Sequence, residues 1–124
     1  MKPRMILGAQ LALLLVSTGV ALAADPTGNY QRDDGMARVR VEACGAAICA
    51  TDTWIKDAAS SEKVGDVLVM NLKPAGGYLL TGTAFDRKRD ATYSFSMTVE
   101  PNRLITKGCV LAGLVCKEVA WLRQ

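Results

Sequence analysis

Strict alternation of apolar and polar residues is the feature that most limits how this chain can fold. In segment 37–43 every second residue is apolar and the residues between are charged, and in segment 91–100 Tyr93, Phe95 and Met97 alternate with hydroxyl side chains. A period of two puts successive side chains on opposite faces of a strand, whereas a helix needs a period of about 3.6. Both segments are therefore predicted to be strands with one buried face.

Six further segments are rich in β-branched, aromatic or alternating residues, as strands are. They are residues 28–32, 48–55, 67–73, 78–85, 104–109 and 117–123. Short turn sequences separate most of them, and the longest connection is 56–65. Such a meander has exposed edges, which closure into a barrel removes. We expect an all-β fold, a small antiparallel up-and-down eight-stranded barrel, with a β-sandwich as the alternative.

The first 23 residues have the layout of a secretory signal peptide. Lys2 and Arg4 precede an apolar stretch over 5–20, and Ala21 and Ala23 supply small residues at positions −3 and −1 of a cleavage site. An uncleaved anchor would need about 20 predominantly apolar residues, and polar residues interrupt this stretch. We therefore expect 1–23 to be a signal peptide and 24–124 to be a single domain. The mature protein is expected to be periplasmic or secreted, with no transmembrane segment.

Charge argues against a nucleic-acid partner. The whole chain carries 15 basic and 12 acidic residues. Removing the two basic residues of segment 1–23 leaves 13 against 12, a net charge of +1. Proteins that bind nucleic acid present a strongly basic face, and this composition does not require one. The densest charged run, 86–90, contains its own counter-charges and is expected to be a solvated loop.

All four cysteines lie beyond the predicted cleavage site, where an oxidising compartment favours disulfides. Three pairings are open. We favour Cys44–Cys49 and Cys109–Cys116, because each pair brackets a short loop between two predicted strands. The alternative, a four-cysteine zinc site, usually shows tighter spacing and a reducing environment. The chain has no histidine, and we expect no metal and no cofactor.

Catalysis has few candidate residues. Without histidine, Ser-His and Cys-His pairs are excluded, and Asp33-Asp34 next to Gly35 is typical of a turn. Asp52 alternates with Ile48, Ala50 and Trp54, and this pattern indicates an inward side chain. In a functional interpretation, an inward carboxyl is an acid with a shifted pKa or a contact for a ligand. In a structural interpretation, it lies near the barrel rim or bonds to a neighbouring strand. We expect a protein that is not an enzyme.

The loop between the last two cysteines is apolar throughout, which is unusual for a surface loop. Two interpretations are open for this loop, a plug folded over the barrel end or a constrained finger that meets a ligand or partner. The candidate rim residues are Val110, Leu111, Leu114 and Val115.

The predicted lumen mixes bulky side chains, such as Phe95 and Met97, with small ones, such as Ala37, Ala50 and Gly82. A packed core and a small pocket both fit this pattern. The candidate partners are accordingly a small apolar ligand or an envelope protein.

Several segments together resemble a secreted bacterial family of lipocalin-like domains whose function is uncharacterised. The resemblance covers nearly all of residues 24–124, and the order of the segments and the placement of the cysteines carry it. Two departures are Gly28-Asn29-Tyr30, where the family begins with Gly-x-Trp, and a shorter connection at 56–65. The matching segments are Ala37–Glu42, Cys44-Gly45, Ile48-Cys49, Trp54–Asp57, Gly82–Asp86, Thr92–Ser94, Lys107–Leu111, Cys116 and Trp121–Arg123.

The resemblance implies a small eight-stranded periplasmic barrel and no known activity. It also implies how the barrel closes, because in lipocalin-like barrels an aromatic residue of the first strand stacks against an arginine of the last. Tyr30 and the Trp121-Leu122-Arg123 ending occupy these places, and the expected role of Tyr30, Trp121 and Arg123 is structural. A cation–π stack of this kind contributes about 0.5–2 kcal/mol.

Overall fold

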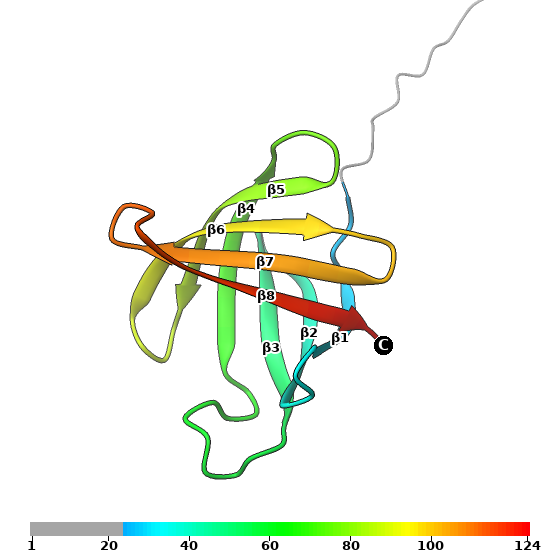
Figure 1. Cartoon of the computed structure of the whole chain (residues 1–124), viewed down its shortest axis with the longest axis vertical. Coiled ribbons are helices and arrows are strands. Elements are labelled where there is room, and N and C mark those ends of the chain that lie inside the picture. Colours follow the sequence, from blue (N-terminus) through cyan, green and yellow to red (C-terminus); the bar gives the residue numbers. More distant parts are fainter. Residues whose placement is uncertain (1–23) are drawn as a thin grey trace, which may run out of the picture.

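The structure is a computed structural model that describes residues 24–124, so the predicted signal peptide lies outside the described residues. All regular elements of the described part are strands, drawn in Figure 1. They are β1 (Gly28–Arg32), β2 (Ala37–Cys44), β3 (Ala47–Ile55), β4 (Val67–Pro74), β5 (Leu79–Asp86), β6 (Ala91–Val99), β7 (Arg103–Val110) and β8 (Val115–Arg123). Every predicted strand is present, and its ends lie within two residues of the prediction.

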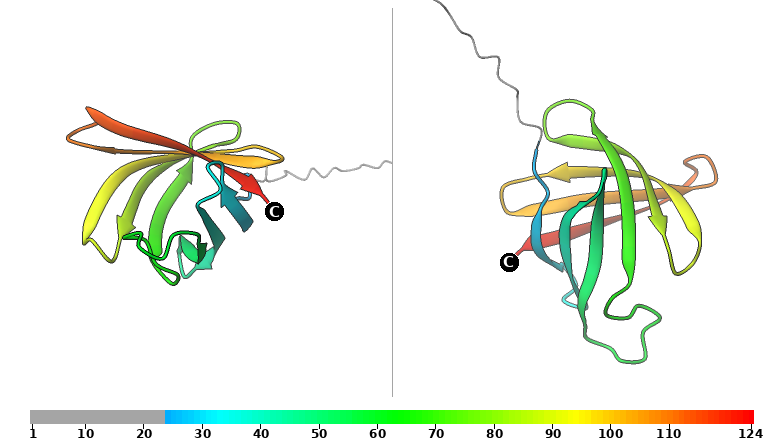
Figure 2. Two further views of the ribbon diagram at one scale, coloured as in Figure 1. Left: turned by 60° about the horizontal axis from the view of Figure 1, so that its bottom comes forward. Right: turned by 180° about the vertical axis from the view of Figure 1, so that it is seen from behind.

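Each strand pairs antiparallel with the next one, and β1 pairs with β8, so the sheet closes into an up-and-down barrel. The closing ladder runs from Tyr30 opposite Arg123 to Arg32 opposite Trp121. This arrangement confirms the predicted barrel and excludes the β-sandwich. Figure 2 shows that the barrel is flattened, with β6, β7 and β8 crossing the direction of β2, β3 and β4.

The core is concentrated at the barrel end where the two described termini meet. Tyr30, Met97 and Leu104 are fully buried there, and Leu80 and Val99 pack with them. Strands β4 and β5 approach each other closely near this core. A Cβ atom at Gly82 would collide with the main-chain carbonyl of Asn71, so the absence of a side chain permits this approach.

An irregularity in β3 changes the side-chain alternation that the sequence predicts. The β2–β3 register shifts between Arg38 and Val39, so Val39 lies opposite Asp52 while Arg38 lies opposite Trp54. One extra residue in β3 re-aims the side chains that follow it. Trp54 is therefore on the outside, where the Arg38 guanidinium lies 4.9 Å from its ring centroid. The alternation that grouped Trp54 with Asp52 on one face was wrong at this position.

Candidate functional site

The barrel interior contains an apolar cavity of about 310 Å³. We call it the inner cavity. Its walls come from six of the eight strands, and its only charged lining residue among those described is Lys117. The other lining residues are Val39, Val41, Ala50, Leu68, Met70, Tyr93, Phe95, Met97, Leu104, Thr106, Gly108, Val119 and Trp121. Of the two interpretations of the lumen, the pocket is therefore the one the structure supports.

Small residues create the room in the inner cavity, and two polar groups of its wall are already satisfied. At Ala50 and Gly108 the wall lacks a bulky side chain. The Trp121 indole N–H donates a hydrogen bond to Thr106 Oγ1 at 3.1 Å, and the Thr106 hydroxyl in turn donates to the Val119 carbonyl at 3.4 Å. Because these two groups have partners inside the wall, this part of the cavity presents an apolar surface to whatever enters it.

A second, polar pocket of about 210 Å³ lies against the inner cavity. We call it the mouth pocket. The two share four lining residues: Val39, Ala50, Leu68 and Trp121. The mouth pocket adds four carboxylates and one guanidinium, which belong to Asp52, Glu62, Asp66, Asp86 and Arg89. The interior therefore changes from apolar to charged along its length.

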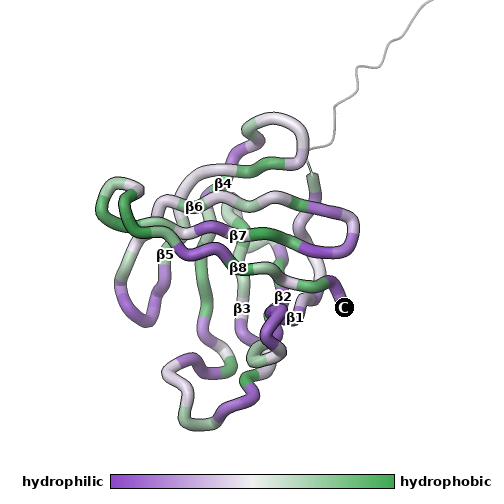
Figure 3. The backbone as a smooth tube through the Cα atoms, in the orientation of Figure 1, coloured by the Kyte–Doolittle hydropathy of each residue, from purple (hydrophilic) through white to green (hydrophobic). Residues whose placement is uncertain are grey.

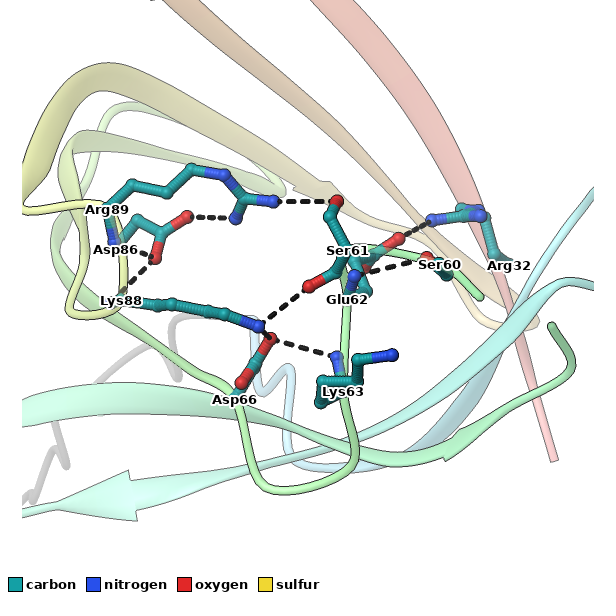
Figure 4. A network of polar contacts seen from close by, with 9 residues as sticks. All are labelled: Arg32, Ser60, Ser61, Glu62, Lys63, Asp66, Asp86, Lys88 and Arg89. Atoms are coloured by element: carbon teal, nitrogen blue, oxygen red, sulfur yellow. Dashed lines mark hydrogen bonds and ion pairs between the residues drawn. The ribbon is translucent and has the colours of Figure 1, made fainter. Parts of the chain in front are cut away.

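Three ion pairs join the segments around the mouth, as Figure 4 shows. Arg32 of β1 contacts Glu62 of the β3–β4 connection, with 2.9 Å between Nη1 and Oε1. Lys88 and Arg89 of the β5–β6 turn contact Asp66 at 3.2 Å and Asp86 at 2.8 Å. We call these six residues the mouth cluster.

The β3–β4 connection is also hydrogen-bonded to the β5–β6 turn. Lys88 Nζ donates to the Ser61 carbonyl at 2.7 Å, and Arg89 donates to the Ser61 hydroxyl at 3.2 Å. The predicted solvated loop at 86–90 is thus part of the mouth pocket. Because its charges are paired with the connection before it, the run does not act as an isolated surface feature.

Asp52 differs from the other carboxylates of the mouth. The residue is 9% exposed, its main chain is hydrogen-bonded to Gly65 and Asp66, and among residues 24–124 its carboxylate has no ion-pair or hydrogen-bond partner. Burial raises its pKa to about 7, with further upward contributions from the negative charges of Glu62, Asp66 and Asp86 that the positive charge of Arg32 only partly offsets. The prediction of an inward side chain is confirmed. Asp52 also lines the mouth pocket, as the alternative of a position near the barrel rim expects, and its carboxylate forms no bond to a neighbouring strand.

The barrel closure follows the sequence expectation. The Tyr30 ring is fully buried, its hydroxyl donates to the Pro26 carbonyl at 2.8 Å, and the Arg123 guanidinium lies 4.9 Å from the ring centroid. Arg123 also donates to the Thr27 carbonyl at 3.1 Å. Trp121 belongs to the same closing ladder but lines both pockets, so its position bears on the cavity as well as on closure.

The disulfides join Cys44 to Cys49 and Cys109 to Cys116, the pairing that the sequence favoured. Cys109 and Cys116 are directly opposed across β7 and β8. Cys44 and Cys49 are offset by two residues, because Cys49 lies opposite Glu42. The described residues include no free cysteine, and none of their His, Cys, Asp and Glu residues form a group of three or more suited to a metal ion.

The apolar loop projects from the β7–β8 hairpin and does not cover the barrel. Leu111 and Leu114 are 68% and 84% exposed, and none of residues 110–115 lines either pocket. Leu111 and Ala112 have the positive φ angles of 54° and 56°, a left-handed conformation that is unusual for residues with side chains. The plug interpretation is therefore wrong. Figure 3 shows this tip as an apolar segment at the end of the hairpin.

The sequence did not identify the residues of the mouth cluster. Glu62 and Asp66 lie in a connection without periodicity, and Arg32 is one charged residue at a strand end. One signal pointed in their direction, the alternation that places Asp52 inward. An inward carboxylate near a strand end implies that charged groups from the adjoining connections approach it.

Comparison with known proteins gives one match. The chain matches no curated protein and no solved structure. Residues 24–124 contain no helix with the length and hydrophobicity of a membrane span. Residues 28–123, which include all eight strands, match the family described as "Uncharacterized protein conserved in bacteria (DUF2147)". The chain therefore belongs to this conserved bacterial family.

Proposed function

We propose that this protein is an exported, non-enzymatic binding protein that holds a small, largely apolar molecule inside its barrel. The observation that carries the proposal is the inner cavity, an apolar space of about 310 Å³ that adjoins a polar pocket. Its size lies at the lower end of the range of about 300–1,000 Å³ found for ligand sites. The expected ligand is correspondingly small.

The apolar lining sets the expected strength of binding. Burial of apolar surface contributes about 25 cal/mol per Å², so a ligand that buries about 300 Å² gains about 7.5 kcal/mol before the costs of association. A dissociation constant in the micromolar to millimolar range follows from that figure. This strength suits a carrier that must also release its ligand.

Export and the absence of catalysis belong to the same proposal. Two disulfides and the signal-peptide pattern of residues 1–23 support an oxidising, extracytoplasmic location. The chain contains no histidine, the side chain most often used for proton transfer near neutral pH. Three of the four mouth carboxylates are engaged in ion pairs, so no second free carboxylate of the described residues faces Asp52.

A cavity-filling variant tests the proposal directly. Gly108 lines the inner cavity, and a Cβ atom added there would lie 3.5 Å from the Phe95 ring, an ordinary contact distance. Gly108→Leu should therefore occupy the ligand volume while the backbone keeps its conformation. The matched control is Lys107→Leu, which adds the same side chain at the next residue, on the exposed outer face of β7.

The measurement is a titration with the neutral fluorescent probe N-phenyl-1-naphthylamine in a Trp54→Phe background, read by the probe's fluorescence and by quenching of Trp121, the tryptophan that then remains. Gly108→Leu should weaken binding by about tenfold or more, because one leucine side chain replaces buried ligand surface. Lys107→Leu should bind as wild type does. Equal probe affinity in wild type and Gly108→Leu, with both proteins folded by circular dichroism, would refute cavity binding.

The exposed hairpin tip favours a second candidate function, in which the protein contacts an envelope protein through its loops. Leu111 and Leu114 are exposed and lie next to the exposed Val110 and Val115. A group of exposed apolar residues of this kind is typical of an interaction site. Leu111→Asp combined with Leu114→Asp should leave probe binding unchanged, because neither residue lines the cavity. Native mass spectrometry of protein purified from its own source separates the candidates. A bound small molecule supports the carrier, and a bound polypeptide supports the second function.

A further inference from the structure

The charges around the mouth pocket are paired with one exception. Glu62, Asp66 and Asp86 each form an ion pair with a basic residue of the mouth cluster. Asp52 has no such partner among residues 24–124, although the residue is only 9% exposed. A buried carboxylate without a partner is costly, and proteins rarely keep an unsatisfied buried group without a reason. A ligand group that pairs with it supplies such a reason.

The position of Asp52 indicates which part of a ligand would meet it. Asp52 lines the mouth pocket, lies opposite Val39 on β2 and is two residues from Ala50 on β3. Val39 and Ala50 line both pockets. The carboxylate therefore stands where the apolar and the charged spaces join. A molecule with its apolar body in the inner cavity would bring its polar end to Asp52.

The charge balance around Asp52 selects a cation over an anion. The charged groups around the mouth are Arg32 from β1 with Asp34 paired to it, Glu62 and Asp66 from the β3–β4 connection, Asp86 from β5, and Lys88 and Arg89 from the β5–β6 turn. With Asp52 ionised, five carboxylates stand against three cations, a net charge of −2. An anionic head group would meet repulsion there, and a cationic one would complete the pairing.

Lys117 is the remaining cation near the path of a ligand. It lines the inner cavity from β8, is exposed to solvent and does not line the mouth pocket. A carboxylate ligand would have to turn its head toward Lys117 and away from the mouth. A head group that faces Asp52 must be positively charged, and one that faces Lys117 must be negatively charged. Ligands of opposite charge therefore distinguish the two orientations.

We propose that the molecule held in the barrel is a small amphipathic amine whose protonated head group pairs with Asp52 while its apolar body fills the inner cavity. This inference rests on the proposed binding function and specifies its ligand class. The ammonium would displace water from the mouth pocket and satisfy the one unpaired carboxylate. The alkyl or aryl part would contact the walls formed by Ala50, Leu68 and Trp121.

The titration of Asp52 gives the interaction a characteristic pH dependence. Its pKa of about 7 means that the free protein is partly protonated near neutrality, because burial, and after it the negative charges of Glu62, Asp66 and Asp86, oppose its ionisation more than Arg32 favours it. An alkylammonium group, like that of lysine, stays charged up to about pH 10. Amine affinity should therefore rise as pH increases through 7, while the affinity for a neutral analogue stays flat.

Isothermal titration calorimetry with octylamine, 1-octanol and octanoate at about pH 8 tests the inference, because the three have nearly the same alkyl chain and differ in the charge of the head group. Wild type should bind octylamine about tenfold more tightly than 1-octanol, the gain of one charge-assisted hydrogen bond. Asp52→Asn should bind the two equally. Asp33→Asn, which neutralises an exposed carboxylate that lines neither pocket, should retain the preference.

Each other outcome overturns the inference in a distinguishable way. Equal affinity of wild type for amine and alcohol refutes the amine ligand but leaves cavity binding intact. If Asp52→Asn still prefers octylamine to 1-octanol, the preference comes from the overall negative charge of the mouth and not from Asp52. If octanoate binds more tightly than octylamine, the ligand head group is an anion that pairs with Lys117. If calcium chloride displaces octylamine, the cation that Asp52 binds is an inorganic ion and not an amine. If none of the three compounds binds, both the inference and the proposed function fail.

Discussion

Replacing Asp52 by Asn should stabilise the folded protein at neutral and alkaline pH. The folded-state pKa of Asp52 is about 7, against an ordinary value of 3.8. Between these values the folded protein holds a proton that the unfolded chain has released, so the free energy of unfolding falls as pH rises. Above pH 7 the side chain is ionised in both states, and the full cost of keeping a buried charge remains.

The size of the effect follows from the two pKa values. One pKa unit corresponds to about 1.4 kcal/mol, so a difference of roughly three units corresponds to about 4 kcal/mol at most. Asparagine has nearly the same shape and no charge, and it leaves polar atoms unpaired much as a protonated carboxyl does. The stability gain of Asp52→Asn should therefore be near zero at about pH 4 and approach its maximum at about pH 8.

Urea unfolding followed by circular dichroism between these two pH values measures this difference. Urea is preferable to guanidinium chloride, whose ions would screen the charges of the mouth. Asp66→Asn is a control that should change the free energy of unfolding in the opposite direction at neutral pH. The Lys63 amide lowers the pKa of Asp66, so its stabilising contribution is present at neutral pH and is lost on acidification. An Asp52→Asn protein that is no more stable than wild type at about pH 8, or whose advantage persists at about pH 4, would refute the reasoning.

Three further predictions follow from other parts of the chain. Arg123→Ala should lower stability by about 1–2 kcal/mol through loss of the closing cation–π stack, and a melting temperature equal to that of wild type would contradict it. Replacing Cys109 and Cys116 together by serine should cost about 2–2.5 kcal/mol on the chain-entropy estimate for a short loop, measured by urea unfolding; an unchanged midpoint would count against the bridge. Ala23→Asp should block processing, whereas secreted wild type should begin at Ala24 on N-terminal sequencing, and a product that retains Met1 would argue against cleavage.

The fold was predictable because the information that determines it is local. Alternation along β2 and β6 fixes which face of each strand is buried, and turn residues mark where strands end. Two errors have local causes as well. The extra residue in β3 moves Trp54 to the outer face, and a left-handed turn at Leu111 and Ala112 ends the β7–β8 hairpin with Leu111 and Leu114 exposed to solvent. Neither irregularity has a signature in the pattern of apolar residues.

The candidate site was only partly predictable, because it depends on contacts between distant segments. The inward orientation of Asp52 can be predicted from the alternation within its own strand. Its lack of an ion-pair partner cannot be predicted in this way, because it depends on Arg32 pairing with Glu62 thirty residues away. Likewise, the charges of 86–90 face the β3–β4 connection only because β4 and β5 bring the two together. Long-range pairing of this kind leaves no trace in composition or spacing.

Closure of the barrel also limits how any polypeptide could recognise this protein. Every strand from β1 to β8 has a neighbour on both sides, but the ladder that closes the barrel joins only residues 30–32 to residues 121–123. Residues 115–119 of β8 therefore pair with β7 alone. A partner strand, one of the ways in which extended peptides bind β proteins, could add at this short stretch but not where a strand is paired on both sides. The same closure shortens the template for edge-to-edge aggregation to this stretch.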